Sequence, residues 1–410
     1  MSTSPPIRAS LPTSTSRPAW LDLAADFRAV EVDARRRIDG VLARQQFVLG
    51  PETAELEASL GARLGAKCAV AVSSGSDALY LALVALGIGA GDAVVLPAFT
   101  FFATAGAVWR AGAVPVFCDI DRKSFNAGAA EFRTAIARHF EGPATQLRHR
   151  ASGARLAALL PVHLYGYSAP IGEIVTLARE HGVAVIEDAA QAIDCRHGGA
   201  SVGCFGEIGC FSFYPTKNLG GPGDGGLVVA RDENLGARIT GLRSHGATST
   251  SYQHDEVGIN ARMGELVAAV LNAKLPHLAG WTARRREIAS LYARLLAPGQ
   301  RHGLVAPALP AGVESHVWHQ FTVRIDDPRG SGRRDRVAAI LAERAVPTRV
   351  FYPQPLHLQP CFATLGGKPG DLPEAECAAG EVLCLPIHPS LSDEAVAVVA
   401  KSLEAAVASA

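Results

Sequence analysis

A carboxylate and a lysine amine follow two separate apolar runs in the middle of the chain. Asp188 comes just after the run at residues 183–186, and Lys217 follows the run at residues 211–214 and a proline. Short apolar runs of this kind are typical of buried strands, and α/β sheets bind ligands at the carboxyl ends of their strands. We therefore expect both side chains at one edge of a sheet, where they could address opposite ends of a flat aromatic ring.

Pyridoxal phosphate is a cofactor with this requirement. A lysine amine forms a Schiff base with its aldehyde, and an acid keeps its pyridine nitrogen protonated so that the ring can accept electrons. Each residue taken alone has a simpler interpretation, since a lysine after a turn is commonly solvated and an aspartate at a strand end commonly caps a helix. The cofactor hypothesis therefore needs a phosphate site elsewhere in the chain.

Residues 72–79 offer such a phosphate site, because they end one expected strand and open a helix. Gly75 would let backbone amides approach a phosphate, Ser76 could donate its hydroxyl, and a helix N-terminus carries partial positive charge. Ordinary helix capping by Ser74 or Ser76 explains the same serines equally well. Ser212, in the second apolar run, could supply another hydroxyl to the same phosphate.

A glycine-rich stretch at residues 221–226 formally matches the dinucleotide-binding motif G-x-G-x-x-G. That motif must follow a strand and open a helix, whereas this stretch leads into the apolar run at residues 227–230. We interpret it as a tight glycine turn. A nucleotide-dependent α/β oxidoreductase, which would bind NAD(P) and show no pyridoxal chromophore, is nevertheless a competing class of enzyme.

The chain divides into four predicted parts. Residues 1–18 indicate a disordered leader, residues 19–50 an arm and a helix, residues 51–280 a large domain, and residues 281–410 a smaller C-terminal α+β domain. Strand and helix patterns alternate in the large domain, which predicts a mainly parallel, seven-stranded α/β sheet covered on both faces. The strands are expected at residues 68–72, 93–96, 114–118, 156–162, 183–187, 211–214 and 227–230.

Composition excludes several other classes of protein. The 410 residues include 39 basic and 39 acidic side chains, which balance to zero formal charge. No basic excess points to nucleic acid or to an anionic membrane, and no apolar run fits a membrane span or a secretory signal. The eight cysteines lack Cys-x-x-Cys or paired Cys/His spacing. We therefore expect no metal site, and free thiols in a reducing cytoplasm.

Short motifs in chain order resemble the DegT/DnrJ/EryC1/StrS family of sugar-nucleotide aminotransferases. The resemblance runs from residue 21 to the C-terminal helix. Its motifs are Ser74-Gly75-Ser76-Asp77-Ala78-Leu79, Pro97-Ala98-Phe99-Thr100-Phe101, Pro161-Val162-His163-Leu164-Tyr165-Gly166, Glu187-Asp188-Ala189-Ala190-Gln191, Phe211-Ser212-Phe213-Tyr214-Pro215-Thr216-Lys217-Asn218, Asn260-Ala261-Arg262-Met263 and Tyr352-Pro353-Gln354-Pro355-Leu356-His357.

The resemblance implies the fold type I architecture of pyridoxal-phosphate aminotransferases, and a homodimer with active sites at the subunit interface. In that arrangement Lys217 would form the Schiff base and Asp188 would pair with the pyridine nitrogen. Gln191 would contact the phenolic oxygen of the ring, and Phe101 would stack on the ring face, although Phe101 could equally be a core aromatic.

The resemblance also implies which residues bind the phosphate group of the cofactor. Gly75, Ser76 and Ser212 would hold it, and Asn260 would reach it from the partner subunit.

Three more residues are weaker candidates for substrate contact, namely His163, Tyr352 and His357. His163 is also well explained as a packed histidine at a strand end.

The activity implied is transamination in two half-reactions, from L-glutamate to the cofactor and then to a keto-sugar on a nucleoside diphosphate. Lysine at position 217 favours a transaminase over the dehydratase branch of the family, which carries histidine there. The segments at residues 252–262 and 352–360 look more like members that aminate C3 of UDP- or dTDP-linked sugars, whose amino-sugar products enter polysaccharides or glycosylated natural products. Amination at C4, a cyclitol ketone as acceptor, and a regulatory cofactor-binding protein with little catalysis are open alternatives.

Overall fold

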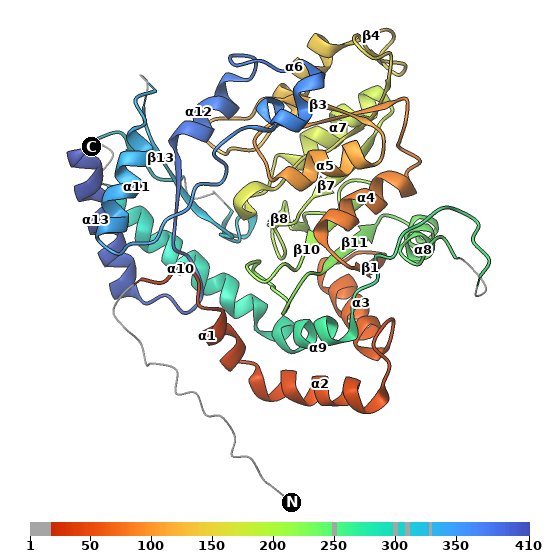
Figure 1. Ribbon diagram of the computed structural model, residues 1–410, viewed down its shortest axis with the longest axis horizontal. Coiled ribbons are helices and arrows are strands. Elements are labelled where there is room, and N and C mark those ends of the chain that lie inside the picture. Colours follow the sequence, from red (N-terminus) through yellow and green to blue (C-terminus); the bar gives the residue numbers. More distant parts are fainter. Residues whose placement is uncertain (1–17, 248–251, 298–301, 308–311, 328–329) are drawn as a thin grey trace, which may run out of the picture.

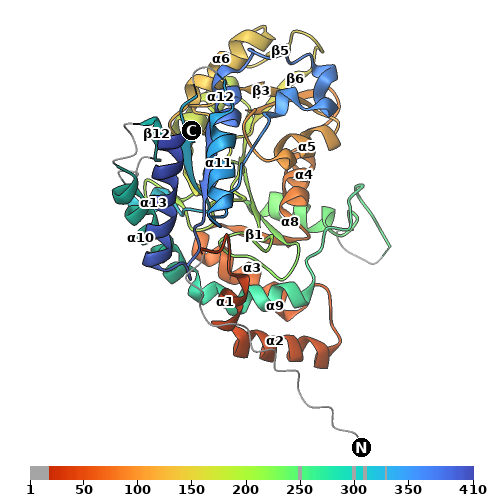
Figure 2. The same ribbon diagram turned by 60° about the vertical axis from the view of Figure 1, so that its left-hand side comes forward.

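The computed structural model describes residues 18–247, 252–297, 302–307, 312–327 and 330–410 (Figure 1). The predicted leader at residues 1–18 lies outside the described residues except for its last position. A large unit with a central sheet carries a smaller unit built from the C-terminal part of the chain. Helices α10 and α13 lie side by side in that smaller unit (Figures 1 and 2).

The large unit contains the predicted alternation of strands and helices. Its elements are α3 (Pro51–Leu64), β1 (Cys68–Val72), α4 (Gly75–Ala85), β2 (Asp92–Pro97), α5 (Phe102–Arg110), β3 (Val114–Cys118), α6 (Ala129–His139), β4 (Phe140–Glu141), β5 (Arg148–His149), β6 (Arg155–Leu159), η1 (Leu164–Gly166), α7 (Ile171–His181), β7 (Ala184–Asp188), β8 (Arg196–His197), β9 (Ala200–Ser201), β10 (Ile208–Ser212), β11 (Gly226–Ala230), α8 (Glu233–Leu242), α9 (Glu265–Lys274) and η2 (Leu275–His277).

Seven strands form the main path of the central sheet, in the order β1-β11-β10-β7-β6-β2-β3, and the short strands β4 and β5 extend it beside β6. Strands β10, β7, β6, β2 and β3 are parallel to one another, whereas β11 runs antiparallel to both of its neighbours. The prediction of a mainly parallel α/β sheet is confirmed. The glycine-rich stretch leads into β11, as the turn interpretation expects.

Helices cover both faces of the sheet, which explains why its strands carry nearly continuous apolar runs rather than alternating ones. In β2, Val94 and Leu96 pack in the cluster that contains α4 and α5. Ala93 and Val95 point the other way and pack in the cluster that contains α6 and α7. With both faces buried, the polar side chains of the strands lie mainly at the strand ends.

The N-terminal segment, in which an arm and a helix were expected, contains the two helices α1 (Leu23–Arg28) and α2 (Glu31–Arg44). Val30 and Ala34 of this arm pack on Val270 and Ala273 of α9. The arm therefore lies along the outside of the large unit, below the sheet in Figure 1.

The small unit has its own core and a three-stranded antiparallel sheet, β12-β13-β14. Helix α10 contributes side chains to both cores. Leu278 packs in the core of the large unit, whereas Ile288 and Tyr292 pack in the core of the small unit. The domain boundary predicted at residue 280 falls inside this helix. The elements are α10 (Leu278–Leu296), β12 (Leu304–Val305), η4 (Val313–Ser315), β13 (Phe321–Ile325), α11 (Arg333–Glu343), η5 (Leu356–Leu358), η6 (Pro360–Leu365), α12 (Pro373–Glu381), β14 (Val382–Leu385) and α13 (Asp393–Ser409).

No helix within the described ranges is both long enough and apolar enough to cross a membrane.

Candidate active site

The two ionisable groups that the sequence singled out lie on adjacent strands. Strand β7 ends at Asp188, and β10 runs parallel to it with Cys210 paired opposite Asp188. The Ala189 amide donates a hydrogen bond to the Cys210 carbonyl 2.8 Å away, which locks the two strand ends together. The turn after β10 then carries Lys217. Asp188 and Lys217 thus meet at the carboxyl edge of the sheet.

The Asp188 carboxylate is buried and receives two hydrogen bonds. The Thr104 hydroxyl donates to its Oδ2 at 2.8 Å, and the Ala190 amide donates to its Oδ1 at 3.1 Å. Burial raises the pKa of this carboxyl, while the two hydrogen bonds and the positive charge of Lys217 act in the opposite direction. Because each oxygen accepts only one of these bonds, both retain a lone pair for a further donor.

The Lys217 side chain is partly buried and close to Asp188. Burial lowers the pKa of its amine to about 8, and the Asp188 carboxylate acts in the opposite direction. Across the described residues, the amine has no hydrogen-bond or ion-pair partner. A lysine amine that is easily deprotonated and not otherwise engaged is suited to nucleophilic attack on an aldehyde.

The turn between β1 and α4 lies against the end of β10. A Cβ placed on Gly75 would be only 2.7 Å from the Cβ of Ser212, so glycine is needed for the close approach. Ser74 caps α4, since its hydroxyl accepts a hydrogen bond from the Asp77 amide at 3.0 Å. Ser76 is exposed. Ser74 is therefore the helix cap, and Ser76 is left exposed at the helix N-terminus, where the predicted phosphate would bind.

Aromatic side chains and an amide lie beside these groups. Phe101 is 53% exposed, and its ring centroid is 6.0 Å from that of Tyr352. Gln191 accepts a hydrogen bond from the Tyr165 amide at 2.6 Å and donates from Nε2 to the Tyr352 hydroxyl at 3.1 Å. Phe101 is thus free to cover a planar ligand, and Gln191 is held in a defined orientation by two tyrosines.

His163 has the environment of a packed histidine. Its side chain has no exposed area, and its Nδ1 accepts a hydrogen bond from the Ala169 amide at 3.1 Å. Nε2 therefore carries the proton, which it donates to Glu187 at 3.1 Å. Glu187 also accepts hydrogen bonds from three backbone amides, those of Gly203, Phe205 and Gly206. Both ring nitrogens are therefore used inside the protein.

His357 is also buried, and its Nε2 lies 3.2 Å from the Glu376 carboxylate. This contact holds the ring against α12, and its Nδ1 has no hydrogen-bond partner among the described residues. Contact between His357 and substrate stays a prediction. Of the three suggested substrate residues, only Tyr352 lies with Gln191 and Phe101.

Asn260 is exposed beside the turn that holds Gly75. The Ser73 amide donates to the Ala261 carbonyl at 2.8 Å, and the Arg262 guanidinium donates to the Asn260 Oδ1 at 3.1 Å. The Asn260 amide nitrogen thus remains available as a donor. Its reach into a partner subunit stays a prediction.

Similarity to known proteins identifies the family of the chain. Residues 29–404 match the DegT/DnrJ/EryC1/StrS aminotransferase family. The chain belongs to this family. It is therefore a pyridoxal-phosphate-dependent aminotransferase, and the oxidoreductase alternative is wrong.

Individual relatives cover nearly the full length of this aminotransferase. It is 42% identical to a pleiotropic regulatory protein of Geobacillus stearothermophilus, over 91% of this chain and 94% of that one. It is 41% identical to the UDP-N-acetyl-3-dehydro-alpha-D-glucosamine 3-aminotransferase of Acidithiobacillus ferrooxidans, over 93% and 95%. The crystal structure of S. venezuelae DesV with a ketimine intermediate superposes with a TM-score of 0.86 at 38% identity, over 96% of this chain and 99% of DesV.

The geometry of this aminotransferase fits the cofactor that its family uses. Because Gly75 has no Cβ, its backbone can lie against Ser212, at the helix N-terminus where a phosphate would have to bind. The buried acid and the amine lie at the neighbouring strand ends.

Sequence reasoning missed several residues that shape the aminotransferase site. Thr104 lies in an apolar helix and gives no local signal. His319 comes from the small unit, is buried, and lies 3.3 Å from the Oδ1 of Asn218, the residue after Lys217. Burial, followed by the charge of Lys217, lowers the pKa of His319 well below its usual range. Contacts between distant segments of this kind depend on the packing of the two units.

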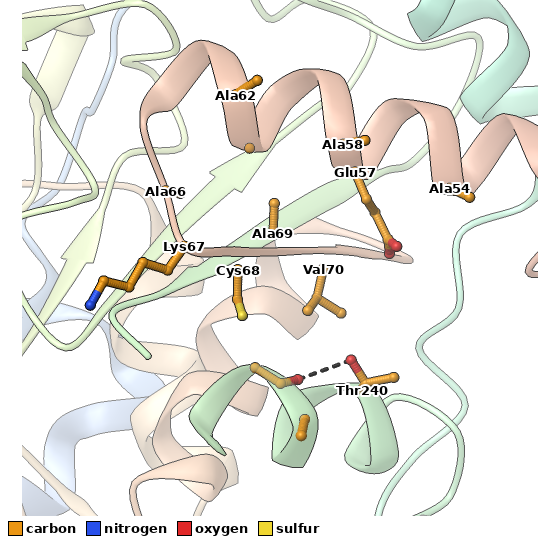
Figure 3. Close-up of a pocket in the computed structure, with 13 residues that line it drawn as sticks. Ala54, Glu57, Ala58, Ala62, Ala66, Lys67, Cys68, Ala69, Val70 and Thr240 are labelled. Atoms are coloured by element: carbon orange, nitrogen blue, oxygen red, sulfur yellow. Dashed lines mark hydrogen bonds between the residues drawn. The ribbon is translucent and has the colours of Figure 1, made fainter. Parts of the chain in front are cut away.

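A hollow of about 500 Å³ lies at the opposite end of β1 from the Gly75 turn (Figure 3). Small side chains of α3 and α8 line it, with Lys67, Cys68 and Glu57 at β1 and α3. None of the residues predicted for the cofactor lines this hollow, so it is not part of the aminotransferase site.

Proposed function

We propose that the protein transfers an amino group from L-glutamate to C3 of a keto-sugar carried on UDP or dTDP. The observation that carries this proposal is the meeting of Lys217 and Asp188 at the edge of the sheet in a chain of this family. The choice of a 3-keto-sugar is supported by the 41% identity to an enzyme named for amination at that position. We expect the enzyme to act in the cytoplasm.

Pyridoxal phosphate, when bound, supplies an aldehyde that takes up the amino group and a ring that delocalises the electrons of the deprotonated substrate carbon. The residues of the chain supply the rest. In the proposal, Asp188 holds the positive charge of the pyridine nitrogen, and Gly75, Ser76 and Ser212 bind the phosphate. The Lys217 amine holds the cofactor at rest and, once displaced by the donor, removes and returns the α-proton.

The spectrum of the cofactor tests the proposed reaction directly. The purified protein should show a visible band that disappears when L-glutamate is added and returns when a UDP- or dTDP-linked 3-keto-sugar follows. A 4-keto-sugar nucleotide and a cyclitol ketone, used in the same assay, distinguish the alternative acceptors. A stable band that does not respond to L-glutamate or to any acceptor would favour a regulatory role, which the relative in Geobacillus stearothermophilus suggests by its name.

We further propose a homodimer in which Asn260 of one subunit reaches the cofactor phosphate of the other. Tyr252 is 96% exposed and Val257 94% exposed in the segment that leads to Asn260. Large apolar side chains this exposed gain stability when another surface covers them. Asn260 itself is exposed and retains a free amide donor.

Mixing two variants tests the shared site. In a dimer formed from a Lys217→Ala subunit and an Asn260→Ala subunit, one site contains both substitutions and the other contains neither, provided that Asn260 acts across the interface. The mixture should therefore recover about a quarter of the wild-type activity after subunit exchange. If Asn260 acts within its own subunit, every site carries one substitution and mixing restores nothing.

A further inference from the structure

Two threonine hydroxyls form a buried chain that ends on the Asp188 carboxylate. The Thr104 hydroxyl lies 2.8 Å from Asp188 Oδ2, and the Thr100 hydroxyl lies 3.2 Å from that of Thr104. Both threonines are buried, with 2% and 0% of their surface exposed for Thr100 and Thr104. Burying a hydroxyl is costly unless it is paired, and these two hydrogen bonds offset that cost.

The hydrogen bonds of this chain run in one direction. An ionised carboxylate can only accept, so the single hydroxyl proton of Thr104 points to Asp188. The Thr104 oxygen must then accept from Thr100, whose proton points to Thr104. Successive hydrogen bonds of the same sense polarise one another, which strengthens the last bond to the carboxylate.

The same helical turn adds a second favourable contribution. Thr104 is the third residue of α5, whose N-cap is Phe101. Asp188 therefore lies beside the N-terminal turn of a helix, where the partial positive charge of the helix favours an anion. This turn also presents Phe101. One short segment therefore supplies both the aromatic side chain predicted to stack on the cofactor and the hydroxyl that donates to Asp188.

We propose that Thr100 and Thr104 are positioning residues that keep Asp188 ionised and aligned with the pyridine nitrogen of the cofactor. The proposal rests on the role proposed above for Asp188. Burial alone favours the neutral acid, and the neutral acid would offer no charge to a protonated pyridine. The donated hydrogen bonds from Thr104 and Ala190 counter this tendency and leave one lone pair on each oxygen for the ring.

Other ionisable groups also face Asp188, and each remains in place when the threonines are changed. They are Lys217, His163, Tyr352 and Cys210. A difference between a threonine variant and the parent protein therefore reports the hydroxyl alone.

The experiment compares Thr104→Val, Thr104→Ser and Thr100→Val with the parent protein. Valine keeps the shape of threonine and removes the hydroxyl, whereas serine keeps the hydroxyl. Thr282→Val is the matched control, because Thr282 is buried in α10 and its hydroxyl has no partner among the described residues. Two readouts are measured on each protein, namely the dissociation constant of pyridoxal phosphate from equilibrium dialysis, and the pH dependence of the visible spectrum of the reconstituted protein.

Thr104→Val should weaken cofactor binding about tenfold, the usual size for a hydrogen bond to a charged group. It should also lower the pH at which the pyridine nitrogen of the bound cofactor loses its proton. Thr100→Val should weaken binding about two- to threefold, since it removes only the polarising bond. Thr104→Ser and Thr282→Val should stay within about twofold of the parent protein.

Unchanged binding and an unchanged spectral transition in Thr104→Val would overturn the proposal. If Thr104→Val does not fold, the test is made on Thr100→Val. Cofactor binding and a spectrum equal to those of the parent protein in that variant would overturn the proposed role of the two hydroxyls. Asp188→Asn separates this outcome from a failure of the role of Asp188. If Asp188→Asn weakens binding while Thr104→Val does not, only the threonines are wrongly assigned. If neither variant has an effect, the pairing of Asp188 with the ring is itself wrong.

Discussion

The Cα of Gly75 lies so close to Ser212 that a Cβ at position 75 would be 2.7 Å from the Cβ of Ser212. This contact joins the turn after β1 to the end of β10, two strands that are separated in the sheet by β11. It brings the N-terminus of α4 and the Ser212 hydroxyl to one place. The predicted phosphate site therefore depends on a close backbone approach that only glycine permits.

Gly75→Ala should lose most of its affinity for pyridoxal phosphate, by about tenfold or more, because the turn must shift away from Ser212. Equilibrium dialysis of the apoprotein measures the change. Gly280→Ala is the control, since a Cβ at that position of α10 meets no atom within 4 Å. That control should bind the cofactor normally and gain about 0.5–1 kcal/mol in unfolding free energy. Normal affinity in Gly75→Ala would contradict the assignment of the phosphate site.

The rate of cofactor capture should depend on pH through Lys217. Only the neutral amine attacks an aldehyde, and burial lowers the pKa of this amine to about 8. The capture rate of the apoprotein, followed by stopped-flow absorbance, should rise about tenfold per pH unit below this value and level off above it. Lys217→Ala and Lys217→Arg should show no covalent capture and no turnover. A flat profile across this range would contradict the prediction.

The lowered pKa of the Lys217 amine also predicts how the stability of the apoprotein varies with pH. The unfolded chain holds the Lys217 proton up to about pH 10.4, whereas the folded chain releases it earlier, so the unfolded state binds more protons between these values. Folding stability should therefore rise with pH from about 8 to about 10.4, and Lys217→Met should remove this rise. Urea unfolding at two pH values measures it, with the exposed Lys67→Met as the control.

His163→Gln distinguishes a packed histidine from a substrate contact. The substitution cannot reproduce both the bond from the Ala169 amide and the bond to Glu187, so it should lower the unfolding free energy by about 2–3 kcal/mol. Thermal unfolding measures the loss. The KM for the sugar nucleotide should stay unchanged in the folded fraction. A raised KM with unchanged stability would favour contact with substrate instead.

Tyr352→Phe should affect the reaction more than the fold. It removes the acceptor for the Gln191 amide but keeps the aromatic contacts with Phe99 and Phe101. We expect kcat/KM to fall about three- to tenfold, with a change in unfolding free energy of about 1 kcal/mol or less. Tyr292→Phe is the matched control, since its hydroxyl donates to the Pro386 carbonyl inside the small unit at 3.0 Å. It should cost stability and leave kcat/KM unchanged.

The local pattern of the chain determined the framework of the site. Apolar runs bounded by polar residues predicted β7 and a second strand ahead of Lys217, and they identified Asp188 and Lys217. The second strand, β10, spans Ile208–Ser212 rather than the expected residues 211–214. The sequence also predicted the turn at Gly75, because a strand that leads into a helix through small residues is a local feature. Strand identity and turn chemistry depend mainly on neighbouring residues, which is why these predictions needed no coordinates.

Only the tertiary structure decided which side chains surround these groups. Thr104 and Asp188 are 84 residues apart, and no local pattern links a threonine in an apolar helix to an acid on another strand. Packing likewise enclosed His163 with the buried Glu187, placed His357 against the partly exposed Glu376, and left Tyr352 beside Gln191. Burial and long-range pairing arise from the way whole elements pack. The amino-acid sequence could therefore name candidates for the site but could not choose among them.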